Sequence, residues 1–210
     1  MRRLGKLVLC CVLVVVMGMC SAFAEMNFDI SVFENDERFS VEFDDMDDTG
    51  EITLAEDGLY FFGLADEEDA GALILELDVK IVNDLPPVLR LTTLYLAEDW
   101  VFGDKFIIKA GENRYTFEID RETEVLDGGN IAEMFTIAFT NESMKLLEDC
   151  IANPESVRFR YDGDSEINGS IPLTQVTVDN MKLLYDTYVA SVATDNDFSI
   201  IGELYPCEIK

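Results

Sequence analysis

Residues Ala72–Val82 read ALILELDVKIV, and this stretch decides the fold class. Every second residue from Leu73 to Ile81 is a branched apolar residue, and the positions between them include Glu, Asp and Lys. A period of two is typical of a β-strand that buries one face. Pro86 and Pro87 then break the pattern. The stretch therefore predicts a long, half-buried strand.

Shorter segments on both sides have the same character. Phe39–Phe43 alternates between apolar and polar residues, and Gly58–Leu64 is apolar and predicted to be buried. Glycine- and asparagine-containing turns at 111–113 and 127–130 separate further segments and favour hairpins. After the two prolines, the predicted strands are Val88–Leu96, Phe106–Lys109, Tyr115–Ile119, Ile131–Thr140 and Val157–Tyr161.

Two segments have helical periodicity instead. The first is expected near 141–153, where Asn141 can cap the start and Pro154 stops the helix. The second is expected near 178–191, after Thr177, with apolar residues at helical spacing that should face the sheet. Many short strands with few helices predict a mainly β fold, antiparallel and β-sandwich-like, with these two helices.

The N-terminus has the three parts of a secretory signal peptide at residues 1–24. Arg2, Arg3 and Lys6 give a positive start, and Leu7–Gly18 is an almost unbroken apolar stretch. Ala22-Phe23-Ala24 then offers small residues to a signal peptidase. We therefore expect a secreted or extracytoplasmic protein that has no membrane contact after cleavage.

Two other uses of the N-terminus stay open. The apolar run from 7 to 23 approaches the roughly 20 residues that span a bilayer, which would allow an uncleaved membrane anchor. Cys20 is a candidate for lipid attachment, although Met19 stands where a small residue is expected. With cleavage, Glu25 becomes the new N-terminus.

The remaining residues 25–210 are expected to form a single domain, because their number suits one hydrophobic core. Within it we distinguish acidic N-terminal strands at 25–86, a sandwich-like region at 87–191 and an acidic tail at 192–210. The segment 25–86 holds 20 Asp and Glu residues and only two basic residues, Arg38 and Lys80.

Charge limits the classes of partner. The full chain has a net charge of −28, and removal of the three basic residues of the signal leaves 12 Lys and Arg against 43 Asp and Glu, or −31. Such a charge repels nucleic acids and anionic membrane surfaces. We expect no nucleic-acid binding, and a partner that is an unknown protein or a cell-envelope component.

Histidine and cysteine usage narrows the chemistry further. The chain has no histidine, which excludes Ser-His-Asp and Cys-His mechanisms and histidine-based zinc sites. Cys150 and Cys207 remain after signal cleavage. An oxidising compartment allows them to pair as a disulfide, and two buried thiols are the equally weighted alternative.

The motif with the most specific spacing is DMDDTGEITLAE at 45–56, which fits the twelve-residue calcium loop of EF-hands. Calcium requires six or more oxygen ligands from a tight turn. The alternating residues before the loop argue for a strand instead of the entering helix of an EF-hand, so a solvated acidic turn is the alternative. The candidate calcium ligands are Asp45, Asp47, Thr49, Glu51 and Glu56.

Three weaker candidates follow later in the chain. The cluster 162–166 is an acidic turn that could bind a metal ion. Arg158 and Arg160 share one strand face, where they would bind an anion or pair with neighbouring carboxylates. Trp100 would stack on a sugar or anchor the core.

From residue 88 onward the chain resembles an uncharacterised domain of exported bacterial proteins and lipoproteins. The resemblance covers about 100 residues and implies a mainly β sandwich with one or two helices, without an established activity, cofactor or site. It rests on Tyr95-Leu96, Asp99-Trp100-Val101-Phe102, Tyr115, Arg121, Glu124-Val125, Gly129, Ile131, Glu133, Ile151-Ala152, Val157-Arg158-Phe159-Arg160, Gly163, Leu183-Leu184 and Tyr188.

The sequence thus supports three functional hypotheses. The first is an extracytoplasmic, non-enzymatic binding or structural domain of unknown ligand, with no cofactor. The second is a module that calcium stabilises through the loop 45–56. The third is a hydrolase that uses carboxylates or a metal ion, for which no pair of carboxylates stands out by spacing.

Overall fold

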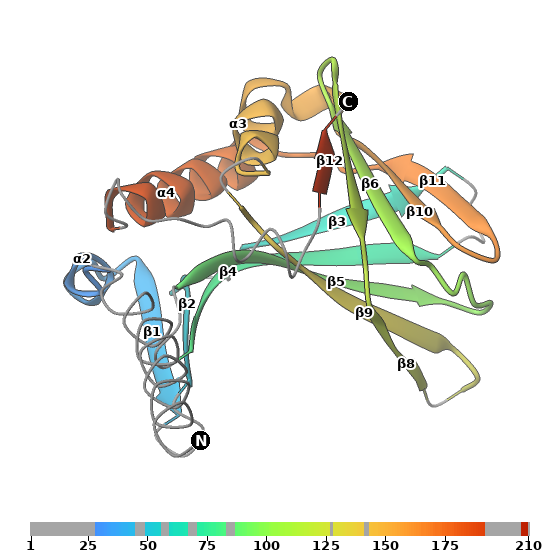
Figure 1. Ribbon diagram of the computed structural model, residues 1–210, viewed down its shortest axis with the longest axis horizontal. Helices are drawn as coiled ribbons and strands as arrows, with labels where there is room; N and C mark the ends of the chain where they lie inside the picture. Colours follow the sequence, from blue (N-terminus) through green and yellow to red (C-terminus); the bar gives the residue numbers. More distant parts are fainter. Residues whose placement is uncertain are drawn as a thin grey trace, which may run out of the picture.

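The computed structural model describes residues 28–44, 49–55, 59–66, 71–82, 87–126, 128–140, 143–191 and 207–209. Twelve strands form one sheet, and every strand pairing in it is antiparallel (Figure 1). The strands are β1 (Phe39–Asp44), β2 (Thr49–Leu54), β3 (Tyr60–Ala65), β4 (Ala72–Val82), β5 (Val88–Ala97), β6 (Lys105–Ala110), β7 (Asn113–Glu118), β8 (Arg121–Val125), β9 (Ile131–Ala138), β10 (Arg158–Asp162), β11 (Glu166–Ser170) and β12 (Cys207–Ile209).

The long strand β4 organises one half of the sheet. Its alternate residues from Leu73 to Val79 are fully buried, as the period of two predicts. One edge of β4 pairs with β5, whereas the other edge is shared between β3 and β2. The hairpin of β1 and β2 therefore branches from the end of β4 beyond the last residue that pairs with β3.

The sheet curls until its two halves face each other. The main path runs β12-β7-β6-β10-β11-β3-β4-β5-β9-β8. Although five strands separate β6 from β9 in this order, the rings of Phe106 and Phe135 lie with their centroids 5.1 Å apart. The ring centroids of Tyr161 in β10 and Tyr95 in β5 likewise lie 5.5 Å apart. The core therefore lies inside the curl and is rich in aromatic rings.

Helices cover the open side of the curl. The α-helices in the described part of the chain are α2 (Ser31–Glu34), α3 (Lys145–Ala152) and α4 (Gln175–Ser191), and a short 3-10 turn, η1 (Pro154–Ser156), follows α3. The helices α3 and α4 lie next to each other (Figure 1). Leu146 and Leu147 of α3 and Met181 and Leu184 of α4 are buried against the core. No helix among the described residues is long and apolar enough to span a membrane.

The predicted mainly antiparallel β fold with helices is confirmed, and its two layers belong to one curled sheet. The first predicted helix appears as α3, which begins at Lys145 and not near 141, and it ends before Pro154 as expected. Asn141, the predicted cap, lies outside the described residues. The second helix begins at Gln175, three residues before the predicted start, because Thr174 caps it: the Thr177 N–H donates to the Thr174 hydroxyl at 3.2 Å. The sequence did not predict α2, β2, β8, β11 or β12. The proposed signal peptide at 1–24 and most of the acidic tail lie outside the described residues.

Candidate functional site

The strand β3 has an edge that the sheet leaves open. It pairs with β4 from Tyr60 to Leu64 on one side. On the other side, β11 pairs with it only at Leu64 and Ala65. Among the described residues, no strand and no backbone hydrogen bond continues this pairing along Tyr60–Gly63.

Two hydrogen bonds identify the backbone groups at this edge. The Leu77 N–H donates to the Leu59 carbonyl at 3.1 Å, and the Asp66 N–H donates to the Asn168 carbonyl at 2.8 Å. Because hydrogen-bonded and non-hydrogen-bonded pairs alternate in antiparallel sheets, Phe61 and Gly63 bond to β4. The N–H and C=O groups of Tyr60 and Phe62 therefore point away from β4, toward the open edge.

Proline chemistry accounts for the end of the pairing. The register of β11 with β3 places Pro172 opposite Phe62, two residues after Ser170. Proline has no N–H group to donate to a neighbouring strand. The N–H of the preceding residue, Ile171, faces β10 and donates to the Val157 carbonyl at 3.0 Å, so the next donor that would face β3 is the one that Pro172 lacks. The chain therefore leaves β3 at this point, and the edge stays open.

The side chains at this edge are apolar and exposed. Tyr60, Phe62 and Leu64 keep 48%, 56% and 52% of their surface accessible on the outer face of the sheet. The strand register places Phe62, Ile74, Leu94 and Met134 side by side across β3, β4, β5 and β9. We call these four residues the outer apolar row. Contiguous exposed apolar surface of this kind is typical of an interaction site.

A polar cluster borders the outer apolar row on β4. A hydrogen bond with Glu76 raises the pKa of the Tyr60 hydroxyl. Farther along β4, Asp78 is fully buried and forms an ion pair with Arg90, which also donates to Glu51 at 3.1 Å. Burial raises the pKa of the Asp78 carboxyl to about 6 in spite of the adjacent guanidinium. The outer face is therefore apolar at β3 and charged toward β2.

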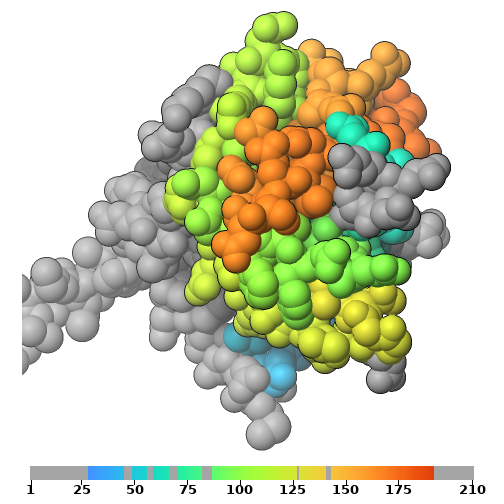
Figure 2. All heavy atoms as spheres, turned by 90° about the vertical axis from the view of Figure 1, so that its right-hand side faces the viewer, coloured from blue at the N-terminus to red at the C-terminus, as the bar shows by residue number. Residues whose placement is uncertain are grey.

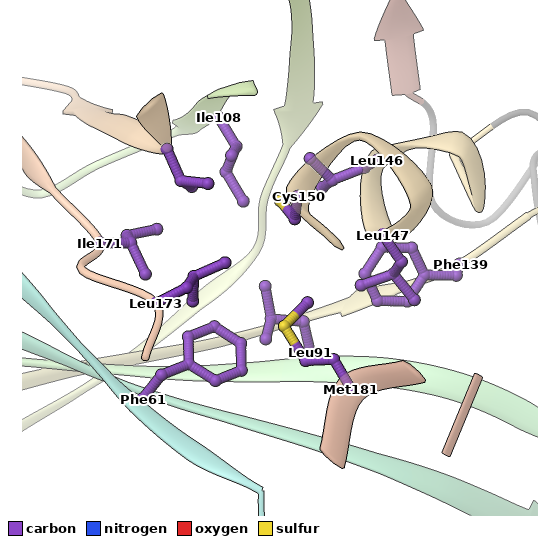
Figure 3. Close-up of a pocket in the computed structure, with 11 residues that line it drawn as sticks. Phe61, Leu91, Ile108, Phe139, Leu146, Leu147, Cys150, Ile171, Leu173 and Met181 are labelled. Carbon is purple, nitrogen blue, oxygen red and sulfur yellow. The ribbon is translucent and has the colours of Figure 1, made fainter. Parts of the chain in front are cut away.

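A small apolar cavity lies between α3, α4 and the sheet (Figure 3). Its volume of about 20 Å³ suits little more than one water molecule, and its lining has no polar surface. Burial also raises the pKa of the Cys150 thiol there to about 12, which keeps it protonated and unreactive. The lining residues are Phe61, Leu91, Ile108, Phe139, Leu146, Leu147, Cys150, Val157, Ile171, Leu173 and Met181.

A buried carboxylate, Glu133, holds the loop that follows β5. It has no exposed surface and accepts the backbone N–H groups of Val101 at 2.7 Å, Phe102 at 2.9 Å and Gly103 at 3.3 Å. The Tyr161 hydroxyl donates to it at 2.5 Å, and burial raises the pKa of that hydroxyl. These contacts fix Phe102 at a φ of +50°, an uncommon conformation for a residue other than glycine.

The candidate calcium ligands are only partly described. Thr49 and Glu51 lie in β2, where Thr49 pairs with Asp44 and with Val82. Asp45, Asp47 and Glu56 lie outside the described residues. Within the described part of the chain, no group of three or more acidic or cysteine side chains could hold a metal ion. Calcium binding by the loop 45–56 stays a prediction.

The other candidates occupy defined places. The acidic cluster 162–166 forms the turn between β10 and β11, and its Glu166 pairs with Arg160 at 3.3 Å. Arg158 pairs with Asp66 at 2.5 Å. Trp100 is half-buried against the core and stacks on Phe102, with ring centroids 5.2 Å apart.

The structure describes only one of the two cysteine side chains that could form a disulfide. Cys150 is a free thiol, and Cys207 lies in β12 opposite Phe117, with a side chain outside the described part. The pairing stays a prediction for the oxidised protein.

Sequence reasoning missed the open edge and the outer apolar row, although a signal existed in Gly58–Leu64. This segment is apolar throughout, which predicts burial, but the structure buries Phe61 and exposes Tyr60, Phe62 and Leu64. Comparisons with protein-family models, with curated proteins and with solved structures give no match. The resemblance to a domain of exported bacterial proteins also stays a prediction.

Proposed function

We propose that this protein is a non-enzymatic binding domain that acts outside the cytoplasm and receives an extended segment of a partner protein at the open edge of β3. One observation carries the proposal: the backbone groups of Tyr60 and Phe62, which no described strand pairs on this side, lie beside exposed apolar side chains on the same strand. An open, apolar strand edge is a template for an additional strand.

Strand addition would use both features at once. Main-chain hydrogen bonds to Tyr60 and Phe62 would supply affinity, and alternate side chains of the added strand would supply specificity. Those on the outer face would cover Tyr60, Phe62 and Leu64, which keep about half of their surface accessible. The expected partner segment therefore has apolar residues at every second position.

The chemistry of the buried polar groups supports a role without catalysis. Glu133 is fully engaged by backbone N–H groups and by Tyr161. Asp149 accepts hydrogen bonds from Tyr115, Asn113 and Lys145. Asp78 is paired with Arg90. Each of these carboxylates is engaged by neighbouring side-chain or backbone donors, and the chain has no histidine to act as a general base.

Action outside the cytoplasm rests on the sequence of residues 1–24, whose basic start, apolar run and small residues before Glu25 fit a signal peptide. The strongly acidic remainder suits a soluble exported domain, and it disfavours nucleic acids as partners.

Amide hydrogen exchange combined with displayed random peptides tests the proposal. In the free protein, we expect the amides of Tyr60 and Phe62 to exchange quickly and those of Phe61 and Gly63 slowly, because only the latter bond to β4. A selected peptide should protect Tyr60 and Phe62. Selected peptides that leave these two amides unprotected would overturn the assignment of the edge.

A pair of variants distinguishes binding at the edge of β3 from nonspecific apolar binding. Phe62→Glu places a charge on the edge, whereas Val176→Glu makes the same change at an exposed valine of α4. Peptide binding should fall about tenfold or more for Phe62→Glu, the effect of losing a central apolar contact. It should stay unchanged for Val176→Glu, and equal losses in both would contradict the proposal.

A further inference from the structure

The outer face also carries a row of basic residues that the acidic composition does not suggest. Arg158 of β10 lies directly opposite Lys109 of β6, and Lys109 lies directly opposite Arg114 of β7. All three side chains are exposed, and the hairpin of β6 and β7 stands next to the hairpin of β10 and β11 (Figure 2). We call these three residues the basic row.

The ion pairing of these residues is unusual within the molecule. Every other described Lys and Arg has a carboxylate within 4.0 Å. Lys109 and Arg114 have none among the described residues, in a chain with 43 Asp and Glu against 15 Lys and Arg. The two unneutralised cations are also direct cross-strand neighbours. Arg158 has one carboxylate, that of Asp66, which lies toward β3.

This arrangement opposes folding. Like charges directly opposite each other in a sheet are destabilising, because their side chains are only about 5 Å apart at Cβ. The abundant carboxylates of the chain could have neutralised Lys109 and Arg114 at little structural cost, since both are on the surface. Their repulsion is relieved when an anion binds between them.

We infer that the basic row binds a soluble anionic ligand that carries linked phosphate groups. Adjacent strands are about 4.8 Å apart, so the three cations span about 10 Å, which a short chain of phosphates can follow. Arginine offers a planar fork for phosphate oxygens at each end of the row, and Lys109 supplies a point charge at its centre.

The charge of the whole molecule favours a small ligand over an anionic membrane. At physiological ionic strength, exposed charges are screened beyond about 8 Å, so a ligand confined to the row responds mainly to its cations. A membrane surface would extend over neighbouring carboxylates such as Glu118 and Glu166 and would be repelled. The site is independent of the open edge of β3, because β11 lies between them and the chemistry differs.

Titration calorimetry of the intact protein with inorganic tripolyphosphate tests the inference. The double variant Lys109→Gln/Arg114→Gln should bind about a hundredfold more weakly, since each of the two lost charge-assisted contacts is worth a factor of about ten. The control Arg38→Gln/Lys182→Gln removes the same charge at two exposed, ion-paired positions elsewhere and should bind as the wild type does.

Further outcomes decide the chemistry. Lys109→Gln should raise the melting temperature of the free protein, because the repulsion with Arg114 and Arg158 disappears; a lower melting temperature would assign the row a structural role and overturn the inference. Absence of tripolyphosphate binding at millimolar concentration would overturn it, as would an equal loss in the control. Three other results would assign the basic row to another ligand. They are binding of citrate as tight as that of tripolyphosphate, binding to phosphatidylglycerol vesicles without binding to tripolyphosphate, and self-association that the double variant abolishes.

Discussion

The substitution Glu133→Gln should destabilise the fold far more than its nearly unchanged shape suggests. The carboxylate accepts three backbone N–H groups and the Tyr161 hydroxyl, and the Arg121 Nε lies 3.7 Å from Oε2. A glutamine at this position keeps one acceptor oxygen, and its NH₂ group must face donors that the second oxygen had satisfied.

The magnitude follows from these contacts. Hydrogen bonds to charged groups contribute about 1.5–3 kcal/mol and neutral ones about 1 kcal/mol, so two retained bonds to Val101 and Phe102 each weaken by about 1 kcal/mol. An N–H of the loop without an acceptor costs about 1–3 kcal/mol more. The total of about 3–5 kcal/mol equals the usual cost of breaking a buried ion pair and is a large share of the stability of a typical domain.

Urea unfolding measures this loss. Trp100 is the only tryptophan and precedes the affected loop, so its fluorescence reports on the transition. The midpoint should fall without a change in slope. Glu122→Gln is the matched control, because Glu122 is exposed on β8, and it should change the free energy of unfolding by less than about 0.5 kcal/mol. A loss of less than about 1 kcal/mol for Glu133→Gln would refute the reasoning.

Three further changes test other parts of the structure. For Asp78, burial raises the folded-state pKa from 3.8 to about 6, so between these pH values the folded protein binds more protons than the unfolded one, and the contribution of Asp78 to stability should fall as pH rises through this window. The slope of melting temperature against pH between pH 4 and 7 should therefore be less negative in Asp78→Asn than in the wild type. An unchanged slope would contradict the raised pKa. In Gly169→Ala, the added Cβ would lie 2.1 Å from the Leu64 carbonyl oxygen. We therefore expect the free energy of unfolding in urea to fall by about 1–3 kcal/mol and the Leu64 amide to exchange faster. A variant as stable as the wild type would show that the backbone at the junction of β11 and β3 can move apart without cost. If the loop 45–56 binds calcium, millimolar calcium should raise the melting temperature relative to a sample with chelator, and Asp45→Asn/Asp47→Asn should abolish the rise. An unchanged melting temperature of the wild type would end the calcium hypothesis.

Local patterns in the sequence predict the elements whose burial repeats regularly. The alternation of Ala72–Val82 gives β4 with its buried face, because one side of this strand contacts only the core. The start of α4 was misplaced because Thr174 and Thr177 are both plausible caps, and the exposed Val176 between them hides where the buried stripe begins. Propensity alone does not choose between two adjacent threonines.

A signal for Glu133 was present in the sequence. In Ile131–Thr140, the alternation places Glu133 on the same face as Ile131, Phe135 and Ile137, which are buried in the core. A carboxylate on such a face requires partners, because an unpaired buried charge is very unfavourable. The sequence could not identify those partners, since they come from a loop 30 to 32 residues earlier and from Tyr161, 28 residues later.

The two proposed binding surfaces follow from the same physical constraint. The inner face of the curled sheet packs against the core and against α3 and α4, so within the described part of the sheet a partner can reach the outer face and the strand edges. One register row on that face runs from Leu64 through Ser170 to Arg158, Lys109 and Arg114. It begins at the apolar end of β3 and ends in cations.

Hairpin register alone sets Lys109 against Arg114, because the predicted turn at 111–113 fixes that pairing within a short segment. The addition of Arg158 and the opening beside Phe62 depend on contacts between segments about 50 to 110 residues apart, which no local pattern contains. Pro172 sets the length of β11, because the pairing with β3 ends after Ser170. The short strand β11 therefore separates the basic row from β3 but does not cover Tyr60 and Phe62. A longer β11 would close the edge and leave the basic row in place, which is why the two activities should be separable by mutation.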